Sequence, residues 1–476
     1  MSVSDYTHYA NTRSNHWDNV STHKQNKNRL GAFYQKLIEY LYCFLILKNK
    51  KILEIGCGHG DLLAALKPSF GVGLDFSSEM IKHASYKHPN LHFVQADAHH
   101  LPFNEKFDVI ILSDLVNDLW DVQSVLAQLK NVVHPDTRII INCFSNLWRV
   151  PLTIANRLGL GSFTLEQNWL TPHDVLNLLH LENVELIKMQ PQILFPFDIP
   201  LISTFFNRYL VKLIPFSWFS LTNFYIARPM MGQIENKQFT VSVIVPARNE
   251  AGNIEAIIQR IPALGSQTEI IFVEGNSTDN TYETIQQTMS NYPDKQCKLY
   301  KQTGKGKGDA VRRGFSEANG DILLILDADL TVPPEVLPRF IEPLVSGKGE
   351  FINGVRLVYP MEDQAMRFFN MIGNKFFSMA FSWLLGQPIK DTLCGTKVLL
   401  KKNYETIAEN RSYFGDFDPF GDFDLLFGAS KLHYKIVEIP IRYRSRTYGE
   451  TNIQRWRHGW QLLKMVIFAA KRIKFI

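Results

Sequence analysis

Residues 322–335 read ILLILDADLTVPPE. An apolar run leads directly into two carboxylates, Asp327 and Asp329, which stand one residue apart. Ionised carboxylates crowded at the end of a buried strand are costly unless a cation or hydrogen-bond donors compensate them. The pair is either a turn before Pro333 and Pro334 that caps a helix, or two oxygen ligands for a divalent metal. The motifs that precede the pair along the chain favour the metal.

Three motifs come before this pair, each at the end of a predicted strand or the start of a predicted helix. VSVIVPARNE, residues 241–250, is a strand followed by polar residues, and IIFVEGNSTDNT, residues 270–281, is a second strand with a polar end. KQTGKGKGDAVRRGF, residues 301–315, is a glycine- and lysine-rich loop that enters a helix. Such a loop offers backbone donors and positive charge, which suit phosphate groups. Strands that alternate with helices in this way predict an α/β fold with a parallel sheet.

The order of these four motifs resembles the inverting glycosyltransferases of family 2, which have a GT-A fold, over about residues 240–455. The resemblance implies that Asp327 and Asp329 hold Mg²⁺ or Mn²⁺ against the diphosphate of a nucleotide sugar, and oxygen ligands suit such hard cations. It also implies a set of residues around the donor nucleotide sugar, namely Pro246, Arg248, Glu250, Glu274, Lys305, Asp327 and Arg446. Glu274-Gly275-Asn276 departs from the family's Asp-Asp-Gly-Ser run, which leaves the choice between UDP and GDP open.

Later motifs resemble the dolichyl-phosphate mannose and glucose synthases, whose acceptor is a polyprenyl phosphate. These motifs are FINGVRLVYP (351–360), KDTLCGTKVL (390–399) and KIVEIPIRYRSRTYGETN (435–452). By resemblance, the acceptor phosphate is held by Arg356 and Arg367, with Asp391 and Lys397 nearby, and Arg446 grips the donor diphosphate. A guanidinium group matches the geometry of phosphate. The alternative for these arginines is ordinary solvation at the surface.

An acceptor that is already an ionised phosphate needs no general base, whereas a hydroxyl acceptor needs a carboxylate within hydrogen-bond reach. FGDFDPFGDFDLL, residues 414–426, supplies four acids: Asp416, Asp418, Asp422 and Asp424. Asp422 and Asp424 open a predicted helix and are the candidate bases. Acids at that position also favour the helix dipole, so a structural role stays open.

The first half of the chain contains KILEIGCGHGDLL, residues 51–63, a strand followed by three glycines, Gly56, Gly58 and Gly60. The dinucleotide fingerprint would require a glycine at position 61, where the chain has Asp61. Three acids follow successive predicted strands: Glu54, which can accept from an amine, Asp75, which can accept from ribose hydroxyls, and Asp97. The carboxyl ends of parallel strands are the usual ligand side of such a sheet.

Together with HWDNVS (16–21), these features resemble the class I S-adenosylmethionine-dependent methyltransferases over about residues 15–230. The resemblance implies that the methionine part of the cofactor is lined by Gly56, Gly58 and Gly60. It also implies that Asp75 holds the ribose, Asp97 with Ala98 faces the adenine, and Asp114 faces the methyl acceptor. Helix capping by Asp75 and a turn role for Asp97 are the alternatives. A first half that binds the cofactor without transferring a methyl group also stays open.

The sequence therefore predicts two α/β domains: a Rossmann-like methyltransferase sheet in residues 1–232, a linker at 233–239, and a GT-A domain in 240–476. A net charge of +5 is too small to indicate nucleic-acid binding, but residues 435–476 hold ten Lys or Arg against two Glu. Five scattered cysteines without a CxxC pair indicate reduced thiols, and no run of about 20 apolar residues predicts a membrane span. The apolar segment 192–224 and the basic aromatic tail could each lie in a membrane interface or pack on their own domains. We expect a cytoplasmic protein, peripheral at the inner face of the cell membrane.

Overall fold

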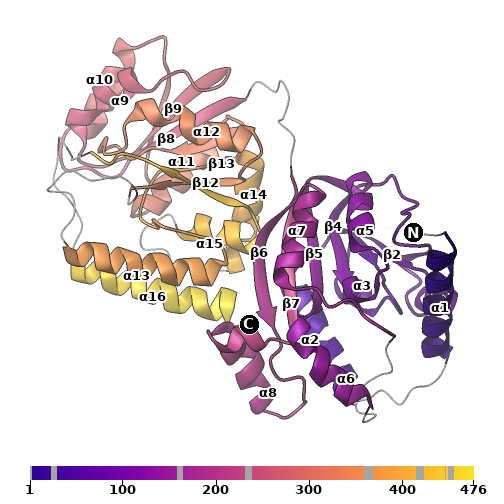
Figure 1. The fold of residues 1–476 in the computed structure, drawn as a ribbon. Coiled ribbons are helices and arrows are strands. Elements are labelled where there is room, and N and C mark those ends of the chain that lie inside the picture. Colours follow the sequence, from indigo (N-terminus) through magenta and orange to yellow (C-terminus); the bar gives the residue numbers. More distant parts are fainter. Residues whose placement is uncertain are drawn as a thin grey trace. The chain divides into compact units, whose positions relative to one another are not determined.

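The computed structural model describes residues 3–22, 29–157, 165–230, 239–356, 358, 368–413, 423–444, 446, 448 and 455–476 (Figure 1). Contacts between Cα atoms divide the chain into unit 1, up to Met230, and unit 2, from Met231 to Lys474. The predicted linker lies outside the described residues apart from Phe239, so its bounds stay a prediction.

Unit 1 is built on a seven-stranded sheet with the order β3-β2-β1-β4-β5-β7-β6. The strands are β1 (Lys51–Ile55), β2 (Phe70–Asp75), β3 (His92–Gln95), β4 (Phe107–Ser113), β5 (Val133–Phe144), β6 (Val184–Gln192) and β7 (Thr222–Pro229). The first five strands pair in parallel, while β7 is antiparallel to both of its neighbours. The carboxyl ends of β1, β2, β3 and β4 therefore share one edge of the sheet.

Side chains of the central strands of unit 1 are buried on both faces, as expected for parallel strands covered by helices on each side. Leu53 and Ile55 of β1 join one apolar cluster, and Ile52 joins another together with Ile38 and Tyr42 of α2. The helices are α1 (Val3–Thr22), α2 (Arg29–Leu45), α3 (Asp61–Ala65), α4 (Ser78–Lys87), α5 (Val122–Gln128), α6 (Arg149–Arg157), α7 (Pro172–Leu181) and α8 (Ile202–Thr204).

Unit 2 has a second seven-stranded sheet, with the order β10-β9-β8-β11-β13-β12-β14. The strands are β8 (Thr240–Ala247), β9 (Gln267–Glu274), β10 (Gln296–Lys301), β11 (Ile322–Ile325), β12 (Phe351–Val355), β13 (Lys397–Leu400) and β14 (Ile436–Pro440). β10, β9, β8 and β11 pair in parallel, and β13 runs antiparallel between β11 and β12. The three motif strands β8, β9 and β11 thus end at one edge.

The helices of unit 2 follow its strands and cover the sheet. They are α9 (Ile254–Arg260), α10 (Thr281–Asn291), α11 (Lys307–Glu317), α12 (Pro338–Val345), α13 (Phe368–Leu385), α14 (Lys401–Glu409), α15 (Phe423–Lys431) and α16 (Arg455–Ala469). α13 and α16 lie side by side (Figure 1). On α16, Leu462 and Met465 are buried while Trp460 and Ile467 are exposed, so the tail packs on its own unit with one face only.

The two α/β sheets confirm the predicted fold class. All five cysteines are free thiols, as predicted. Within the described residues, no helix is long and apolar enough to cross a membrane.

Candidate active sites

The glycine loop of unit 1 follows β1 and is held against the end of β2. Gly58 donates its amide to Asp75 Oδ2 at 3.0 Å, and Ser77 donates to Asp75 Oδ1 at 2.9 Å. Gly58 has a φ of 51°, and a Cβ built on it would meet no atom within 4 Å. The left-handed backbone conformation of Gly58 and the open space beside it leave room for a ligand next to the loop. Asp75 therefore shapes the loop and keeps lone pairs that can accept from ribose hydroxyls.

Gly56 and Gly60, the other two predicted cofactor glycines, have different surroundings from Gly58. Both have left-handed backbones, with φ of 76° and 73°. A Cβ on Gly56 would lie 2.8 Å from Leu115 Cδ1, and a Cβ on Gly60 would lie 2.5 Å from Phe93 Cζ. Side chains of the protein itself therefore fill the space that a side chain at either of these two positions would need.

The backbone amides of Gly56 and Gly60 are also engaged within the loop. Gly56 donates to the Leu74 carbonyl at 2.7 Å, and Gly60 donates to the Cys57 carbonyl at 2.9 Å. Backbone conformation and close packing thus account for glycine at both positions without a ligand. Gly56 and Gly60 shape the loop, and of the three glycines only Gly58 faces open space; lining of the methionine part by Gly56 and Gly60 stays a prediction.

Glu54 lies near the end of β1 and is buried, yet its Oε2 has no hydrogen-bond partner among the residues that the structure describes. Burial raises the pKa of Glu54 to about 8, and the charges of Asp75 and Asp61 raise it as well. A buried acceptor without a donor is unfavourable unless a ligand supplies one. An ammonium group beside the glycine loop would do so, which fits the amino end of S-adenosylmethionine.

Asp97, predicted to face adenine, follows β3 and is surrounded by donors. It accepts from the backbone amide of His99 at 2.9 Å, contacts the His99 ring nitrogen Nδ1 at 2.7 Å, and accepts from the Tyr6 hydroxyl. Burial alone would raise the pKa of Asp97, but the hydrogen bonds from His99 and Tyr6 lower it to about 2. Asp97 is thus a fixed carboxylate, and Ala98 beside it is buried. These contacts are compatible with either the adenine role or the turn role.

Helix α1 covers this edge of unit 1, which the sequence did not reveal. Asp18 accepts from the Ser77 hydroxyl at 2.5 Å and from the Glu79 amide at 3.1 Å, while Tyr6 reaches Asp97. Trp17 donates to Asp118 Oδ2 at 2.9 Å. The segment HWDNVS is therefore part of a helix that packs over the predicted cofactor residues. The cluster of aromatic and acidic residues in this segment was the one feature of the sequence that indicated such a position.

Asp114 follows β4 with a φ of 54° and sits in a polar cluster. Its Oδ1 accepts from the Tyr34 hydroxyl at 2.9 Å and from Asn142 Nδ2 at 2.6 Å, and Tyr42 donates to Asn142 Oδ1 at 2.7 Å. Burial raises the pKa of Asp114 to about 7, against the opposing effect of the hydrogen bonds from Tyr34 and Asn142. A carboxyl poised near neutral pH at the ligand edge suits proton transfer.

In unit 2, Asp327 and Asp329 lie at the edge where β11 ends, and each is paired with a cation. Lys307, the first residue of α11, contacts Asp327 Oδ1 at 2.6 Å. Burial alone would raise the pKa of Asp327, but Lys307 and the more distant charges of Lys397 and Arg356 lower it. A Cβ on Gly395 would lie 2.0 Å from Asp327 Oδ2, so only glycine fits here.

The second carboxylate is held by an arginine from far along the chain. Arg446 donates to Asp329 Oδ2 at 2.8 Å and contacts Glu250 at 3.2 Å. The hydroxyl of Thr331 donates to Asp329 Oδ1 at 2.7 Å. The structure therefore brings together the predicted residues Asp329, Glu250 and Arg446.

Within the described residues, no group of three or more His, Cys, Asp or Glu side chains could hold a metal ion. The two carboxylates fit Mg²⁺ or Mn²⁺ in the nature of their oxygen donors, but such ions take six or more ligands. Oxygens of a bound diphosphate and of water would have to complete the set. Metal binding at this pair should therefore depend on a nucleotide.

The remaining donor residues surround the same edge. Pro246 is part of β8, and Arg248 just beyond it is exposed. Glu274 ends β9, is buried, and accepts from the Ser277 amide at 2.5 Å, which ties up one of its oxygens in its own turn. Lys305 is exposed in the loop before α11.

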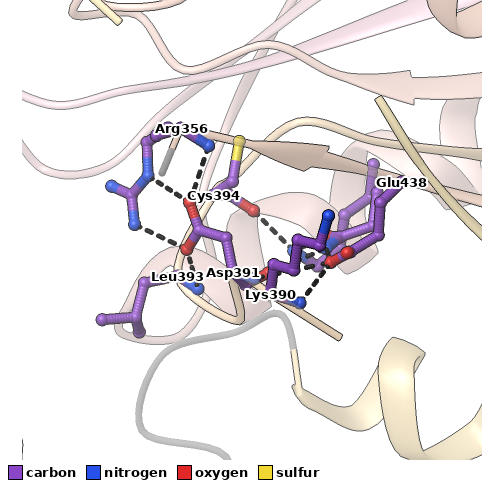
Figure 2. Close-up of polar contacts among 8 residues, drawn as sticks. Arg356, Lys390, Asp391, Leu393, Cys394 and Glu438 are labelled. Carbon is purple, nitrogen blue, oxygen red and sulfur yellow. Dashed lines mark hydrogen bonds and ion pairs between the residues drawn. The ribbon is translucent and has the colours of Figure 1, made fainter. Parts of the chain in front are cut away.

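The predicted acceptor residue Arg356 forms a buried ion pair with Asp391 (Figure 2). Its Nε and Nη2 donate to Asp391 at 2.7 and 2.8 Å, and Asp391 also accepts from the Leu393 amide at 3.0 Å. Burial would raise the pKa of Asp391, but Arg356 lowers it. Two planar groups joined by two hydrogen bonds hold each other in a fixed orientation.

Lys397 is fully buried, and its ammonium donates to the Cys394 carbonyl at 2.5 Å and to Asn353 Oδ1 at 3.3 Å. Its charge lowers the pKa of Asp327, and the predicted role of Lys397 at the acceptor stays a prediction. Asp424, a candidate base, is the second residue of α15 and pairs with Arg411 at 3.2 Å and with Arg312 at 3.8 Å. Arg367, Asp416, Asp418 and Asp422 lie outside the described residues.

Lys307 contacts the predicted metal ligand Asp327, yet the sequence alone did not single it out in unit 2. The motif KQTGKGKGD contains three lysines, and only the register of α11 shows that Lys307 faces Asp327 while Lys305 faces solvent. Its place at the first residue of a helix after Gly306 was the available signal.

Comparison with known families gives two matches. Residues 46–171 match a model described as "Methyltransferase domain", and residues 242–405 match "Glycosyl transferase family 2". These matches confirm the predicted fusion, and the chain contains both domains.

Individual relatives match unit 2. The chain is 35% identical over 235 residues to a dolichol-phosphate mannosyltransferase of Pyrococcus furiosus, covering 47% of this chain and 64% of the relative. It is 23% identical over 225 residues to an undecaprenyl-phosphate 4-deoxy-4-formamido-L-arabinose transferase of Edwardsiella ictaluri, covering 46% and 65%. The chain thus spans less than two thirds of the length of these two relatives. A solved glucosyl-3-phosphoglycerate synthase of Mycobacterium tuberculosis, crystallised with Mn²⁺ and UDP, covers 50% of this chain and 80% of its own at 20% identity, with a TM-score of 0.38 that is too low to bear on function.

Proposed function

We propose that unit 2 transfers a sugar from a nucleotide sugar to a polyprenyl phosphate with inversion at the anomeric carbon, and depends on Mg²⁺ or Mn²⁺. The observation that carries this proposal is the pairing of Asp327 with Lys307 and of Asp329 with Arg446 at the edge where the motif strands end. Two carboxylates and two movable cations in one place suit a metal–diphosphate complex. The names of the two relatives, both polyprenyl-phosphate transferases, support the acceptor class.

The residues at the ends of the motif strands in unit 2 would have different roles in the transfer. Asp327 and Asp329 would hold the metal, which offsets the negative charge that builds on the departing diphosphate. Lys307 and Arg446 can turn from the carboxylates to phosphate oxygens, because a guanidinium or ammonium binds either anion. The acceptor phosphate attacks the anomeric carbon of the sugar from the side opposite to the leaving diphosphate. It needs no base because it is already ionised.

The position of Asp424 supports a phosphate acceptor over a hydroxyl acceptor. Its carboxylate is bound to Arg411, and a carboxylate engaged by a guanidinium is a poor proton acceptor. The hydroxyl alternative then rests on Asp422. Arg356, held rigidly by Asp391, is the candidate for the acceptor phosphate, with Arg367 as a second.

We also propose that unit 1 is an active S-adenosylmethionine-dependent methyltransferase. The unpartnered Oε2 of buried Glu54 next to the glycine loop supports binding of the cofactor's amino group. The cluster around Asp114 supports transfer rather than mere binding, because a carboxyl with a pKa of about 7 can take a proton from an acceptor. Production of S-adenosylhomocysteine by the wild type and its loss in Asp114→Asn would support transfer, whereas cofactor binding without turnover on any extract would favour a sensor.

We further propose peripheral contact of unit 2 with the cytoplasmic face of a membrane through α16. Trp460 and Ile467 are exposed on this helix, and Lys464, Lys471 and Arg472 beside them are exposed too. Aromatic and basic side chains together suit an anionic lipid surface. Washed membranes should retain the protein at low salt and release part of it at high salt, since salt screens such contacts; full solubility at low salt would refute this part.

The test of the glycosyl transfer is an organic-extraction assay with Mn²⁺, undecaprenyl phosphate and a panel of labelled nucleotide sugars. Wild type should carry label into the lipid phase for one sugar, and Asp329→Asn should not. Asp294→Asn, an exposed acid away from the motif strands, is the matched control and should behave as wild type. Metal-dependent hydrolysis of a nucleotide sugar without lipid label would move the acceptor to a hydroxyl compound.

A further inference from the structure

The connection between β6 and β7, residues 193–221, is far longer than its topology requires. The two strands are antiparallel neighbours, which a two-residue turn can join. The connection instead contains α8 and further short helical turns at Phe205–Tyr209, Leu210–Lys212 and Phe216–Phe219 (Figure 1). The topology of the sheet therefore does not explain the length of this connection.

The segment 193–221 exposes many large apolar side chains and buries several polar ones. Its buried side chains are the polar Ser203, Lys212 and Ser220 and the apolar Ile193, Val211 and Leu221. Its exposed side chains are mostly apolar: Phe197, Ile199, Leu201, Ile202, Phe205, Tyr209, Leu213, Ile214, Phe216, Trp218 and Phe219. Leu201, Ile214 and Trp218 are 84%, 71% and 63% exposed. Folding in water favours the opposite pattern, so the folding of unit 1 does not account for these apolar side chains.

Specific contacts hold the segment in this conformation. Asn207 Oδ1 accepts from the amides of Leu194 and Phe195 at 2.8 Å each, and its Nδ2 donates to the Phe195 carbonyl at 2.8 Å. Lys212 donates to Gln192 Oε1. The rings of Phe195 and Phe206 lie 5.4 Å apart. The apolar side chains are therefore presented by a built scaffold.

A second stretch adjoins the segment and extends its surface. Trp148 Nε1 donates to the Phe219 carbonyl at 2.9 Å, which brings the start of α6 next to the connection. Leu147, Val150 and Ile154 are exposed there. We call the exposed apolar side chains of 147–154 and 193–221 the apolar surface.

The charge around the apolar surface is mainly positive. Arg149 and Arg208 are exposed in its two stretches and Arg157 lies exposed just after the first, against one exposed acid in the two stretches, Asp198. Large apolar side chains with Trp and Tyr among them, next to arginines, are the composition of surfaces that enter the headgroup region of anionic membranes. The positive charge beside the apolar side chains complements the negative charge of such a bilayer.

The apolar surface stands at the ligand edge of the sheet. β5 and β6 are both antiparallel to β7, so their carboxyl ends, Phe144 and Gln192, lie at the same edge as Gly58 and Asp75. The ring of Phe144 lies 5.6 Å from that of Tyr34, whose hydroxyl donates to Asp114. The predicted methyl-acceptor site and the apolar surface are thus joined through packed side chains.

We propose that the apolar surface docks unit 1 on an anionic lipid bilayer, so that the methyl acceptor of unit 1 is a bilayer-bound amphiphile rather than a soluble metabolite. The statement about the acceptor rests on the proposed methyltransferase activity, whereas the docking does not. This contact is separate from the one proposed for α16, because it lies in unit 1 and at the methyltransferase's own ligand edge.

The test places an environment-sensitive nitrobenzoxadiazole label on the full-length chain at Leu201→Cys, with Cys43 and Cys297 replaced by Ser. Tyr86→Cys on α4, where the native side chain is 92% exposed, is the matched control. Vesicles of phosphatidylcholine with phosphatidylglycerol should shift the emission at position 201 to the blue and leave position 86 unchanged. No shift at 201 overturns the proposal. A blue emission at 201 without vesicles also overturns it, because protein then covers the surface.

A second variant measures the energy of the contact. Ile214→Asp combined with Trp218→Asp should weaken vesicle binding about tenfold or more, since each buried apolar side chain contributes strongly to transfer from water. Leu181→Asp, at the exposed end of α7, should have no effect. Binding of S-adenosylmethionine should stay unchanged in both variants, which shows that unit 1 is folded. Equal vesicle binding by the double variant and the wild type overturns the proposal. If the wild type does not bind S-adenosylmethionine, the methyltransferase assignment is refuted and the result on membrane docking still holds.

Discussion

Replacing Lys307 by Met should tighten the binding of Mn²⁺ in the absence of nucleotide. In the unliganded protein the Lys307 ammonium lies 2.6 Å from Asp327, and both side chains are 28% exposed. A metal that binds Asp327 must compete with this contact. The methionine side chain has a similar length and no charge, so it removes the competition and keeps most of the packing.

The expected size follows from the contact. A hydrogen bond between charged groups contributes about 1.5–3 kcal/mol, and partial exposure favours the lower value. Since about 1.4 kcal/mol corresponds to a factor of ten, Mn²⁺ alone should bind Lys307→Met about tenfold more tightly. In the wild type, a nucleotide diphosphate should tighten Mn²⁺ binding, because the ammonium can move to a phosphate; this coupling should shrink in the variant.

The assay is a titration of free Mn²⁺ by electron paramagnetic resonance, with and without UDP or GDP. Lys298→Met is the matched control, since Lys298 pairs with Glu269 at 2.7 Å elsewhere in unit 2. Unchanged Mn²⁺ affinity in Lys307→Met, or an equal gain in Lys298→Met, would refute the reasoning that Lys307 competes with the metal.

Three further predictions follow from single contacts. The pKa of Glu54 is about 8, so binding of S-adenosylmethionine below that pH should release a proton from Glu54. The affinity for S-adenosylmethionine should then fall by up to tenfold per pH unit from pH 8 to 6. Calorimetry should show this pH dependence in the wild type and not in Glu54→Gln. Gly395→Ala should abolish nucleotide-dependent Mn²⁺ binding, since its Cβ would lie 2.0 Å from Asp327 Oδ2. Asp391→Asn should lower the free energy of unfolding by about 3 kcal/mol, measured by denaturant titration, because Arg356, only 17% exposed, would lose its charged partner.

These predictions have matched controls. Gly373→Ala, where a Cβ would meet nothing within 4 Å, should leave Mn²⁺ binding intact. Arg260→Gln breaks the exposed pair with Glu335 and should cost at most about 1 kcal/mol. A loss of stability in Asp391→Asn no greater than in Arg260→Gln would contradict the role given to that buried pair.

The pH dependence of Glu54 has a second consequence, for stability. Its pKa is higher in the folded chain than its usual value of 4.5, so the folded state favours the protonated form. The stabilisation is fully present below about pH 4.5 and is lost as the pH rises through about 8. Thermal unfolding of unit 1 without ligand should show this decline in the wild type and less of it in Glu54→Gln.

The strand-end motifs were predictable because their chemistry is local. A run such as KILEIG or LLILDAD predicts both a buried strand and the polar residue at its end. Parallel strands place those polar residues at one edge of the sheet. Asp75, Glu54, Asp327 and Asp329 were therefore named from sequence and lie at the two sheet edges. The surroundings of single loop residues were harder to predict, because they depend on parts distant in the chain. Gly56 packs on Leu115, which follows another strand, and no pattern in the loop itself shows this contact.

The order of the two α/β domains and the strand ends that carry glycines and acids could be predicted from the sequence, since a few neighbouring residues decide each of these. The pairing of distant residues follows only from the tertiary structure: Arg446 reaches Asp329 across 117 residues, and Tyr6 of α1 reaches Asp97 across 91. The tertiary structure also decided that most of the large apolar side chains of 193–221 are exposed, because an apolar run has the same sequence whether it is buried or exposed. Burial and long-range pairing depend on the order of strands in the sheet, and no local pattern contains that order.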